Sequence, residues 1–205
     1  MPNIIIKILF YNKIIIIILL KIKIKKMAEQ EKQLVYSKGV LEMITVANEY
    51  CLFVESAEKY SKEIILDYLQ KICPLLYLKG SLLPDIKISD ENANERYLTE
   101  ENWLKIFNIL REKFDNSDEY WELLEDEIEG VKPIKARLSD NFADVYQDLK
   151  DFILLYQKNT IAAKENAVME CKKQFGNHWG ERIIKAHKII HDIIYKESSN
   201  FENQS

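Results

Sequence analysis

Four carboxylates in the sequence have the spacing that a metal site between helices would require. Glu122 and Glu125 are three residues apart, as are Asp148 and Asp151. Residues three apart share one face of a helix, and two such pairs could hold Mg²⁺ for phosphate chemistry. However, a helical wheel drawn from Phe142 places both aspartates nearly opposite the apolar residues of their helix, which predicts that they face solvent. A metal-dependent nucleotide phosphohydrolase of all-helical type therefore stays as an alternative function.

The three histidines all lie near the C-terminus. His187 and His191 are four residues apart and could share a metal ion, and His191-Asp192 is a dipeptide that metal phosphohydrolases place on a helix. Such an enzyme needs a further histidine from an earlier helix and a later aspartate, yet no histidine precedes His178 and no aspartate follows Asp192. We therefore expect no metal or other cofactor, and we interpret these histidines as hydrogen-bonding residues at helix interfaces.

Signatures of nucleophilic catalysis are absent from the sequence. It contains no G-x-S-x-G motif, no cysteine in a catalytic context and no glycine-rich phosphate loop. Cys51, Cys73 and Cys171 are odd in number and widely spaced, which is typical of buried thiols in a reducing cytosol rather than of a disulfide framework. We expect no catalytic residues and a cytoplasmic protein that is not an enzyme.

The elements that position these residues are predicted to be helices. Apolar residues recur at intervals of three and four, and the 205 residues include only five glycines and four prolines. This pattern predicts an all-α fold, a single-domain bundle of about six helices within residues 37–196. Ser61, Thr99 and Ser139 are the expected helix caps. The expected helices span residues 37–57, 61–83, 100–114, 117–126, 140–158 and 160–196.

Three segments lie outside this regular pattern. Residues 85–98 and 126–137 are expected to be irregular connections, because polar residues, glycine and proline cluster there. Residues 197–205 are interpreted as a polar tail. In the last helix, Gly176 and Gly180 either bend the helix or split it in two.

Residues 1–26 have a different composition from the rest and are interpreted as a separate hydrophobic and basic extension. Of these 26 residues, 21 are Ile, Lys, Asn, Phe or Tyr, whose codons can consist entirely of A and T. We therefore interpret the segment as translated A/T-rich DNA, with Met27 as the true start. The alternative is a membrane anchor through residues 4–20, although Lys7, Asn12 and Lys13 interrupt that apolar run. A membrane association is expected only if the extension is genuine.

The charge of the chain bears on its partners. The formal net charge is −4, and without the six lysines of residues 1–26, 23 lysines and arginines face 33 aspartates and glutamates, a net charge of −10. An acidic surface repels phosphate backbones, so we expect no nucleic acid partner. Another protein is the expected partner.

Four stretches of the sequence resemble one known family. They are VANEYC (46–51), CPLLYLKGSLLP (73–84), DNFADVYQDLKDFILLYQ (140–157) and FGNHWGERIIKAHKIIH (175–191). Together they resemble the bacterial domain-of-unknown-function family numbered 5063, small helical proteins seen especially in Bacteroidetes. The resemblance covers roughly residues 37–195. It implies a helical fold and no particular activity, so no catalytic residue is carried over.

The most distinctive residues of these stretches are the candidate partner-binding residues. Two glycines allow another backbone to approach closely, and the aromatic residues offer amphipathic edges. They form either a helix–helix junction or a groove that receives a protein partner. The sequence therefore favours a non-catalytic interaction or accessory protein. The candidates are Tyr146, Gln147, Asp148, His178, Trp179 and Gly180.

Overall fold

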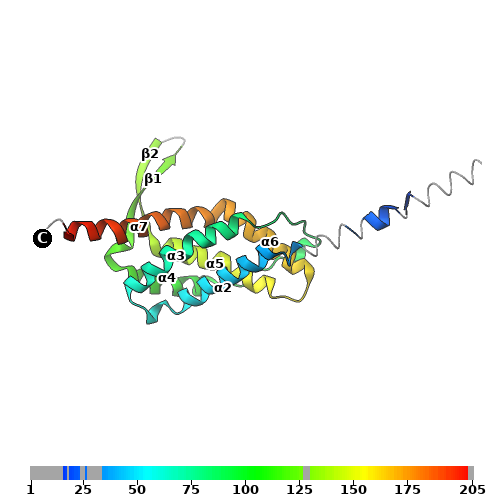
Figure 1. Ribbon diagram of the computed structural model, residues 1–205, viewed down its shortest axis with the longest axis horizontal. Coiled ribbons are helices and arrows are strands. Elements are labelled where there is room, and N and C mark those ends of the chain that lie inside the picture. The colour runs from blue at the N-terminus through cyan, green and yellow to red at the C-terminus, as the bar shows by residue number, and fades with distance from the viewer. Residues whose placement is uncertain (1–15, 18, 24–25, 27–33, 127–129, 203–205) are drawn as a thin grey trace, which may run out of the picture.

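The computed structural model describes the chain except for residues 1–15, 18, 24–25, 27–33, 127–129 and 203–205. The described part is a bundle of helices from which one β-hairpin projects (Figure 1). Its six α-helices confirm the predicted helical bundle, and the two strands of the hairpin are an addition to it. The elements are α2 (Lys38–Glu55), α3 (Lys62–Ser81), α4 (Glu100–Phe114), β1 (Glu119–Asp126), β2 (Gly130–Arg137), α5 (Leu138–Tyr156), α6 (Ile161–Gln174) and α7 (Gly180–Glu202).

Helix α5 is the centre of the bundle. It packs against α2, α4, α6 and α7, and each of its residues is buried or half-buried. The prediction that Asp148 and Asp151 face solvent is therefore wrong: the side chain of Asp148 is only 9% exposed, and Asp151 is half-buried. The side chain of Asp144, one turn before Asp148, is only 17% exposed. A helical wheel separates the apolar face from the polar face, but it does not show that other elements cover the polar face and supply hydrogen bonds to it.

The starts of the helices are set mainly by hydroxyl and carboxylate caps. The predicted caps Ser61 and Thr99 are confirmed, since each accepts a hydrogen bond from a backbone N–H of the first turn. The prediction of Ser139 as a cap is wrong, because α5 already begins at Leu138. Asp118, which is buried, supplies the carboxylate instead and accepts hydrogen bonds from the backbone N–H and the hydroxyl of Ser139, both at 2.8 Å.

The predictions of a short helix over residues 117–126 and of an irregular connection over residues 126–137 are wrong. Glu119–Asp126 and Gly130–Arg137 form the antiparallel hairpin β1–β2, in which Glu119 pairs with Arg137 and Asp126 pairs with Gly130. The apolar residues of β1 match a helical spacing as well as a strand spacing, and a run this short does not separate the two. Pairing with β2 decides in favour of the strand. Gly130 has a φ of 74°, a conformation that glycine adopts without strain.

The last predicted helix contains a π-helical turn over Phe175–Trp179, which lies between α6 and α7 and includes Gly176. The backbone is helical at Gln174, Phe175 and Gly180, so the turn does not separate the two segments and the alternative of a split is wrong. Such single π-turns inside helical segments are frequent at functional sites. The three cysteines are free and buried, and burial raises the pKa of Cys51, Cys73 and Cys171. They are packed thiols, as predicted.

The sequence predicts separate segments at the two ends of the chain, an extension over residues 1–26 and a polar tail over residues 197–205. Most of residues 1–26, and with them the question of an anchor through residues 4–20, lie outside the described residues. Where the structure describes the chain, it contains no helix that is both long enough and apolar enough to span a membrane. At the other end, α7 continues as far as Glu202 and thus into the segment interpreted as a polar tail.

Candidate functional site

A polar cluster joins α5 to α7 beside the π-helical turn. The Nδ1 atom of His178 lies 2.6 Å from Oδ2 of Asp148, and the Nε–H of Arg182 donates to Nε2 of His178 at 3.0 Å. Arginine has no acceptor atom, so Nε2 of the imidazole must be the acceptor. The proton of the neutral ring therefore sits on Nδ1 and is donated to Asp148.

A second carboxylate ties a third helix into this cluster. Asp144 accepts a hydrogen bond from Nε1–H of Trp103 on α4 at 2.7 Å, and its other oxygen lies 2.8 Å from Nη2 of Arg182. Arg182 also donates to Asn141, which in turn donates to the hydroxyl of Tyr120 at the base of the hairpin. The cluster thus links α4, α5 and α7 through charge-assisted hydrogen bonds, and it reaches β1 through the neutral hydrogen bond between Asn141 and Tyr120.

Both ring nitrogens of His178 already have hydrogen-bond partners, and this limits the chemistry of the cluster. A general base needs a ring nitrogen that can reach a substrate proton. In His178, Nδ1 is engaged by Asp148 and Nε2 by Arg182. The half-buried guanidinium of Arg182 lies against Nε2, the ring nitrogen that would have to accept a proton if His178 were the base of a catalytic dyad. The arrangement therefore holds helices in register and does not present an activated nucleophile or base.

Asp148 gives this cluster a testable pH dependence. Burial raises the pKa of the Asp148 carboxyl, and the hydrogen bond from His178 opposes that rise only in part. Because the folded pKa lies above the unfolded value of about 4, the stabilising contribution of protonated Asp148 is complete below pH 4 and is lost as the pH rises through the folded pKa.

We predict that Asp148→Asn removes this dependence, because asparagine does not titrate. The free energy of unfolding of the unmodified protein minus that of Asp148→Asn should therefore decrease as the pH rises from about 3 to 7. Urea unfolding of both proteins across this range measures the difference. Taking the difference cancels the titration of the groups that Asp148 does not contact. Because His178 contacts Asp148, the comparison is repeated in a His178→Gln background, where a constant or rising difference would contradict the assignment.

The six candidate partner-binding residues face different neighbours, and most of their surface is inside the protein: Asp148 meets His178, whereas Tyr146 faces α2 and Trp179 packs against Gly80 of α3. Tyr146 is buried and donates its hydroxyl proton to Glu55 at 2.9 Å. Trp179 is fully buried and donates Nε1–H to the carbonyl of Cys171 at 3.1 Å. Gly180 is buried as well, while Gln147 and His178 are half-buried. This placement fits the helix-junction alternative, and contact of these six residues with a partner stays a prediction.

The four carboxylates of the metal alternative are engaged by different parts of the structure. Glu122 forms an ion pair with Lys185, Asp148 accepts from His178, and Asp151 accepts from the backbone N–H groups of Tyr97 and Leu98. The side chain of Glu125 lies outside what the structure describes. Across the described residues, no group of three or more His, Cys, Asp or Glu side chains could hold a metal ion. This placement gives the phosphohydrolase alternative no support.

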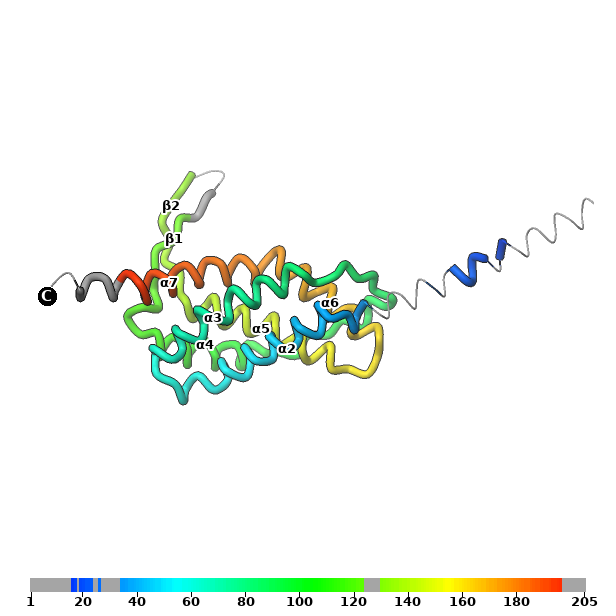
Figure 2. Tube along the Cα trace, in the orientation of Figure 1, coloured from blue at the N-terminus to red at the C-terminus, as the bar shows by residue number. Residues whose placement is uncertain are grey.

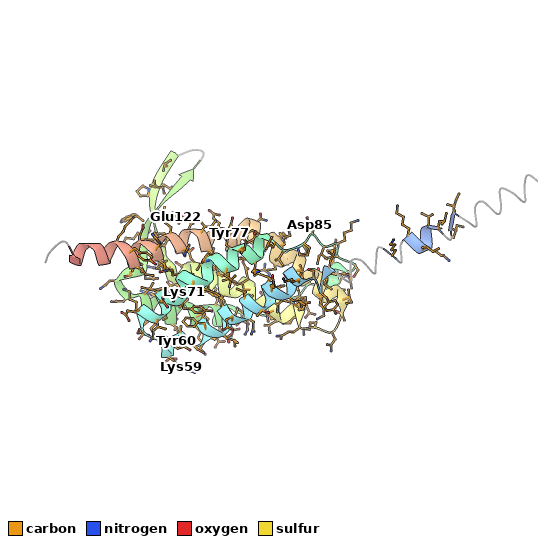
Figure 3. All side chains as sticks on the ribbon, in the orientation of Figure 1. Lys59, Tyr60, Lys71, Tyr77, Asp85 and Glu122 are labelled. Atoms are coloured by element: carbon orange, nitrogen blue, oxygen red, sulfur yellow. The ribbon has the colours of Figure 1, made fainter. Side chains whose placement is uncertain are left out.

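Among the residues that the structure describes, His187 and His191 are surrounded by largely apolar residues and not by the further ligands that a metal ion would need. His187 and His191 line a groove between α3 and α7, which has a volume of about 550 Å³ and is partly open to solvent. Tyr77 of α3, labelled in Figure 3, and Pro74 also line this groove. The neighbours of the histidines are therefore largely apolar, as expected of residues at a helix interface.

The hairpin carries a surface that the sequence did not predict. Its inner face is attached to the bundle through the Glu122–Lys185 ion pair and the hydroxyl of Tyr120. Figure 3 labels Glu122 at the base of the hairpin. Its outer face, defined here by Trp121, Leu123, Val131 and Pro133, is exposed, with exposed fractions of 67%, 69% and 61% for the first three. The alternation Trp121-x-Leu123 and Val131-x-Pro133 is the signal that a strand interpretation would have used.

The chain is similar to known proteins both in sequence and in fold. A family model described as "Domain of unknown function (DUF5063)" matches residues 34–196. The crystal structure of protein BF1032 from Bacteroides fragilis is similar, with 33% sequence identity and a TM-score of 0.71, and the match covers 79% of this chain and 96% of that chain. No curated protein matches. The matched range contains all four stretches that resembled a family in the sequence.

Proposed function

Because the chain belongs to the DUF5063 family, which has no assigned activity, we propose a function from its geometry: it is a non-catalytic protein-interaction protein. One observation carries this proposal, namely the exposed outer face of the hairpin. Trp121, Leu123 and Val131 are each more than 60% exposed on a hairpin that projects from the bundle (Figure 2). Contiguous exposed apolar side chains of this kind mark interaction sites.

The attachment of the hairpin supports a presented surface. An isolated two-stranded hairpin is only marginally stable in water. Here the strands are held by the ion pairs of Glu119 with Lys135 and Arg137, and by the contacts of Tyr120 and Glu122 with the bundle. A preformed surface loses little conformational entropy on binding. Tryptophan is also among the residues that contribute most at protein interfaces.

Other features support the remaining parts of the proposal. The non-catalytic assignment rests on His178, whose two ring nitrogens are both engaged. A protein partner is favoured over a nucleic acid because the chain has a net charge of −4. We place the protein in the cytoplasm, since its three cysteines are free thiols, which a reducing compartment maintains.

We predict that Trp121→Glu abolishes capture of the partner. The test is affinity purification from the native host with quantitative mass spectrometry, in parallel for the unmodified protein, Trp121→Glu and Leu52→Glu. Leu52 is a matched control because it is 51% exposed on α2, away from the hairpin. A protein that binds the outer face should fall about tenfold or more with Trp121→Glu and remain with Leu52→Glu.

Thermal unfolding of all three proteins shows whether they are folded, and substitutions at such exposed positions should change stability by about 0.5 kcal/mol or less. The proposal is contradicted if no protein co-purifies in stoichiometric amount, or if Trp121→Glu retains every protein that the control retains.

A further inference from the structure

A small cavity lies between α5, α6 and residues 82–99, which connect α3 to α4. Phe152 and Ala167 contribute apolar parts of its wall, and Arg96, Asp148 and Glu170 contribute charged parts. Its volume is about 20 Å³. A cavity needs about 10–15 Å³ to hold one water molecule, whereas pockets for small organic ligands measure about 300–1,000 Å³. The size of the cavity therefore limits its ligand to a water molecule or a small cation.

One carboxylate in this wall has an oxygen without a donor. The side chain of Asp148 is 9% exposed, and its Oδ2 is the oxygen that faces Nδ1 of His178. Among the residues that the structure describes, none donates a hydrogen bond to Oδ1. Polar groups buried this deeply are as a rule hydrogen-bonded, either to protein or to ordered water. Because His178 is not part of the cavity wall, Oδ1 is the oxygen of Asp148 that a ligand in the cavity can reach.

Two other charged groups of the wall face each other across a gap. Nη2 of Arg96 lies 3.9 Å from Oε1 of Glu170, which is too long for a direct hydrogen bond. Polar groups at such a separation are commonly bridged by a water molecule. Arg96 also lies near Asp148: burial raises the pKa of the Asp148 carboxyl, and the hydrogen bond from His178 and the positive charge of Arg96 oppose that rise. Arg96 is thus placed to share one ligand with both carboxylates.

We propose that this cavity binds one ordered water molecule, which accepts a hydrogen bond from Arg96 and donates one each to Asp148 and Glu170. Buried water molecules typically make about three hydrogen bonds to groups that otherwise lack partners, and these three side chains provide them. The water molecule completes the hydrogen bonding of Asp148. It also connects the polar cluster of α5 and α7 to α6 and to the connection that carries Arg96. This site is independent of the hairpin and of the proposed function.

A water molecule fits this cavity better than a small cation does. Two carboxylates attract a cation, but the guanidinium of Arg96 places a positive charge in the same wall and repels it. In the part of the chain that the structure describes, no group of three or more His, Cys, Asp or Glu side chains could hold a metal ion. Water can accept from the guanidinium and donate to both carboxylates, whereas a cation interacts favourably with the carboxylates alone.

A high-resolution crystal structure of the full chain tests the site directly. We expect one electron density peak in the cavity, within about 3.2 Å of Oδ1 of Asp148, the guanidinium of Arg96 and the carboxylate of Glu170. Crystals in which RbCl replaces the sodium and potassium salts identify the occupant, because bound rubidium gives an anomalous signal and water does not. The proposal is overturned if the cavity shows no peak, or if the peak carries a rubidium signal.

Two variants test the bridge in solution. Arg96→Ala removes the proposed donor and opens the cavity to solvent, because Arg96 forms part of its wall. Lys87→Ala is the matched control, since it removes a positive charge from an exposed residue of the same connection that is not part of the wall. Magnetic relaxation dispersion of the water signal counts water molecules that stay bound for longer than the protein takes to tumble. We expect Arg96→Ala to lose the contribution of one molecule, and Lys87→Ala to keep it.

Both variants are expected to fold, because Arg96 is 61% exposed and Lys87 is exposed as well. Circular dichroism and thermal unfolding check this. Equal dispersion amplitudes for the two variants and the unmodified protein would overturn a water bridge through Arg96, and so would an equal loss in both variants. Capture of a partner by the outer face of the hairpin is measured separately, so the failure of one proposal leaves the other intact.

Discussion

Trp179→Ala is expected to lower the free energy of unfolding by about 3–5 kcal/mol, the cost of removing a large aromatic side chain from a core. Trp179 is fully buried and packs edge-on against Phe175 at a centroid distance of 4.9 Å. The ring also contacts the region of Gly80 on α3, where even an added Cβ would overlap it. Alanine would leave a cavity between the π-helical turn and α3, and it would leave the carbonyl of Cys171 without its side-chain donor.

Trp121→Ala is the matched control for this prediction. Trp121 is 67% exposed, so its truncation should change the free energy of unfolding by about 0.5 kcal/mol or less. Chemical denaturation of both variants and the unmodified protein measures the comparison. Equal losses for the two tryptophans would contradict the placement of Trp179 in the core.

Gly180→Ala is expected to destabilise the protein by about 1–3 kcal/mol, the usual cost of overpacking a close-packed site. A Cβ at Gly180 would overlap the backbone carbonyl oxygen of Phe175 and would lie 2.9 Å from its ring. Because the nearest obstacle is a backbone atom, relief requires a shift of the π-helical turn itself.

Gly176→Ala provides the control within the same turn. A Cβ at Gly176 meets no atom within 4 Å, and alanine has the higher helix propensity, so this variant should be neutral or more stable by up to about 1 kcal/mol. Thermal unfolding of the two glycine variants measures the contrast. A smaller loss for Gly180→Ala than for Gly176→Ala would show that close packing at Gly180 does not set the geometry of the turn.

The local apolar pattern of residues 119–126 does not determine that they form a strand of the β1–β2 hairpin. In EYWELLED, Tyr120, Leu123 and Leu124 have helical spacing, whereas Trp121 and Leu123 alternate as in a strand. Both patterns are present within eight residues, so the choice between them depends on a partner strand several residues away. Pairing with β2 settled that choice, and no short window of the sequence contains this information.

The aspartates of α5 illustrate a second limit. The helical wheel correctly placed these aspartates opposite the apolar face, but the exposure to solvent predicted from that position was wrong. A polar face is covered when other elements bring donors to it, and here Trp103 of α4, Arg182 of α7 and the π-helical His178 do so. All three residues lie 30 or more positions from their partners on α5.

The sequence by itself determined the helical class, most helix positions, two of three predicted caps, the packed cysteines and the family. These features depend on interactions between residues a few positions apart, whose periodicity is written directly in the chain. Only the tertiary structure decided that every residue of α5 is buried or half-buried, that His178 is engaged at both nitrogens, and that Trp121 and Leu123 are exposed on a strand of the hairpin. Those features depend on which distant segments meet, and the apolar and polar pattern of a single segment does not specify its neighbours.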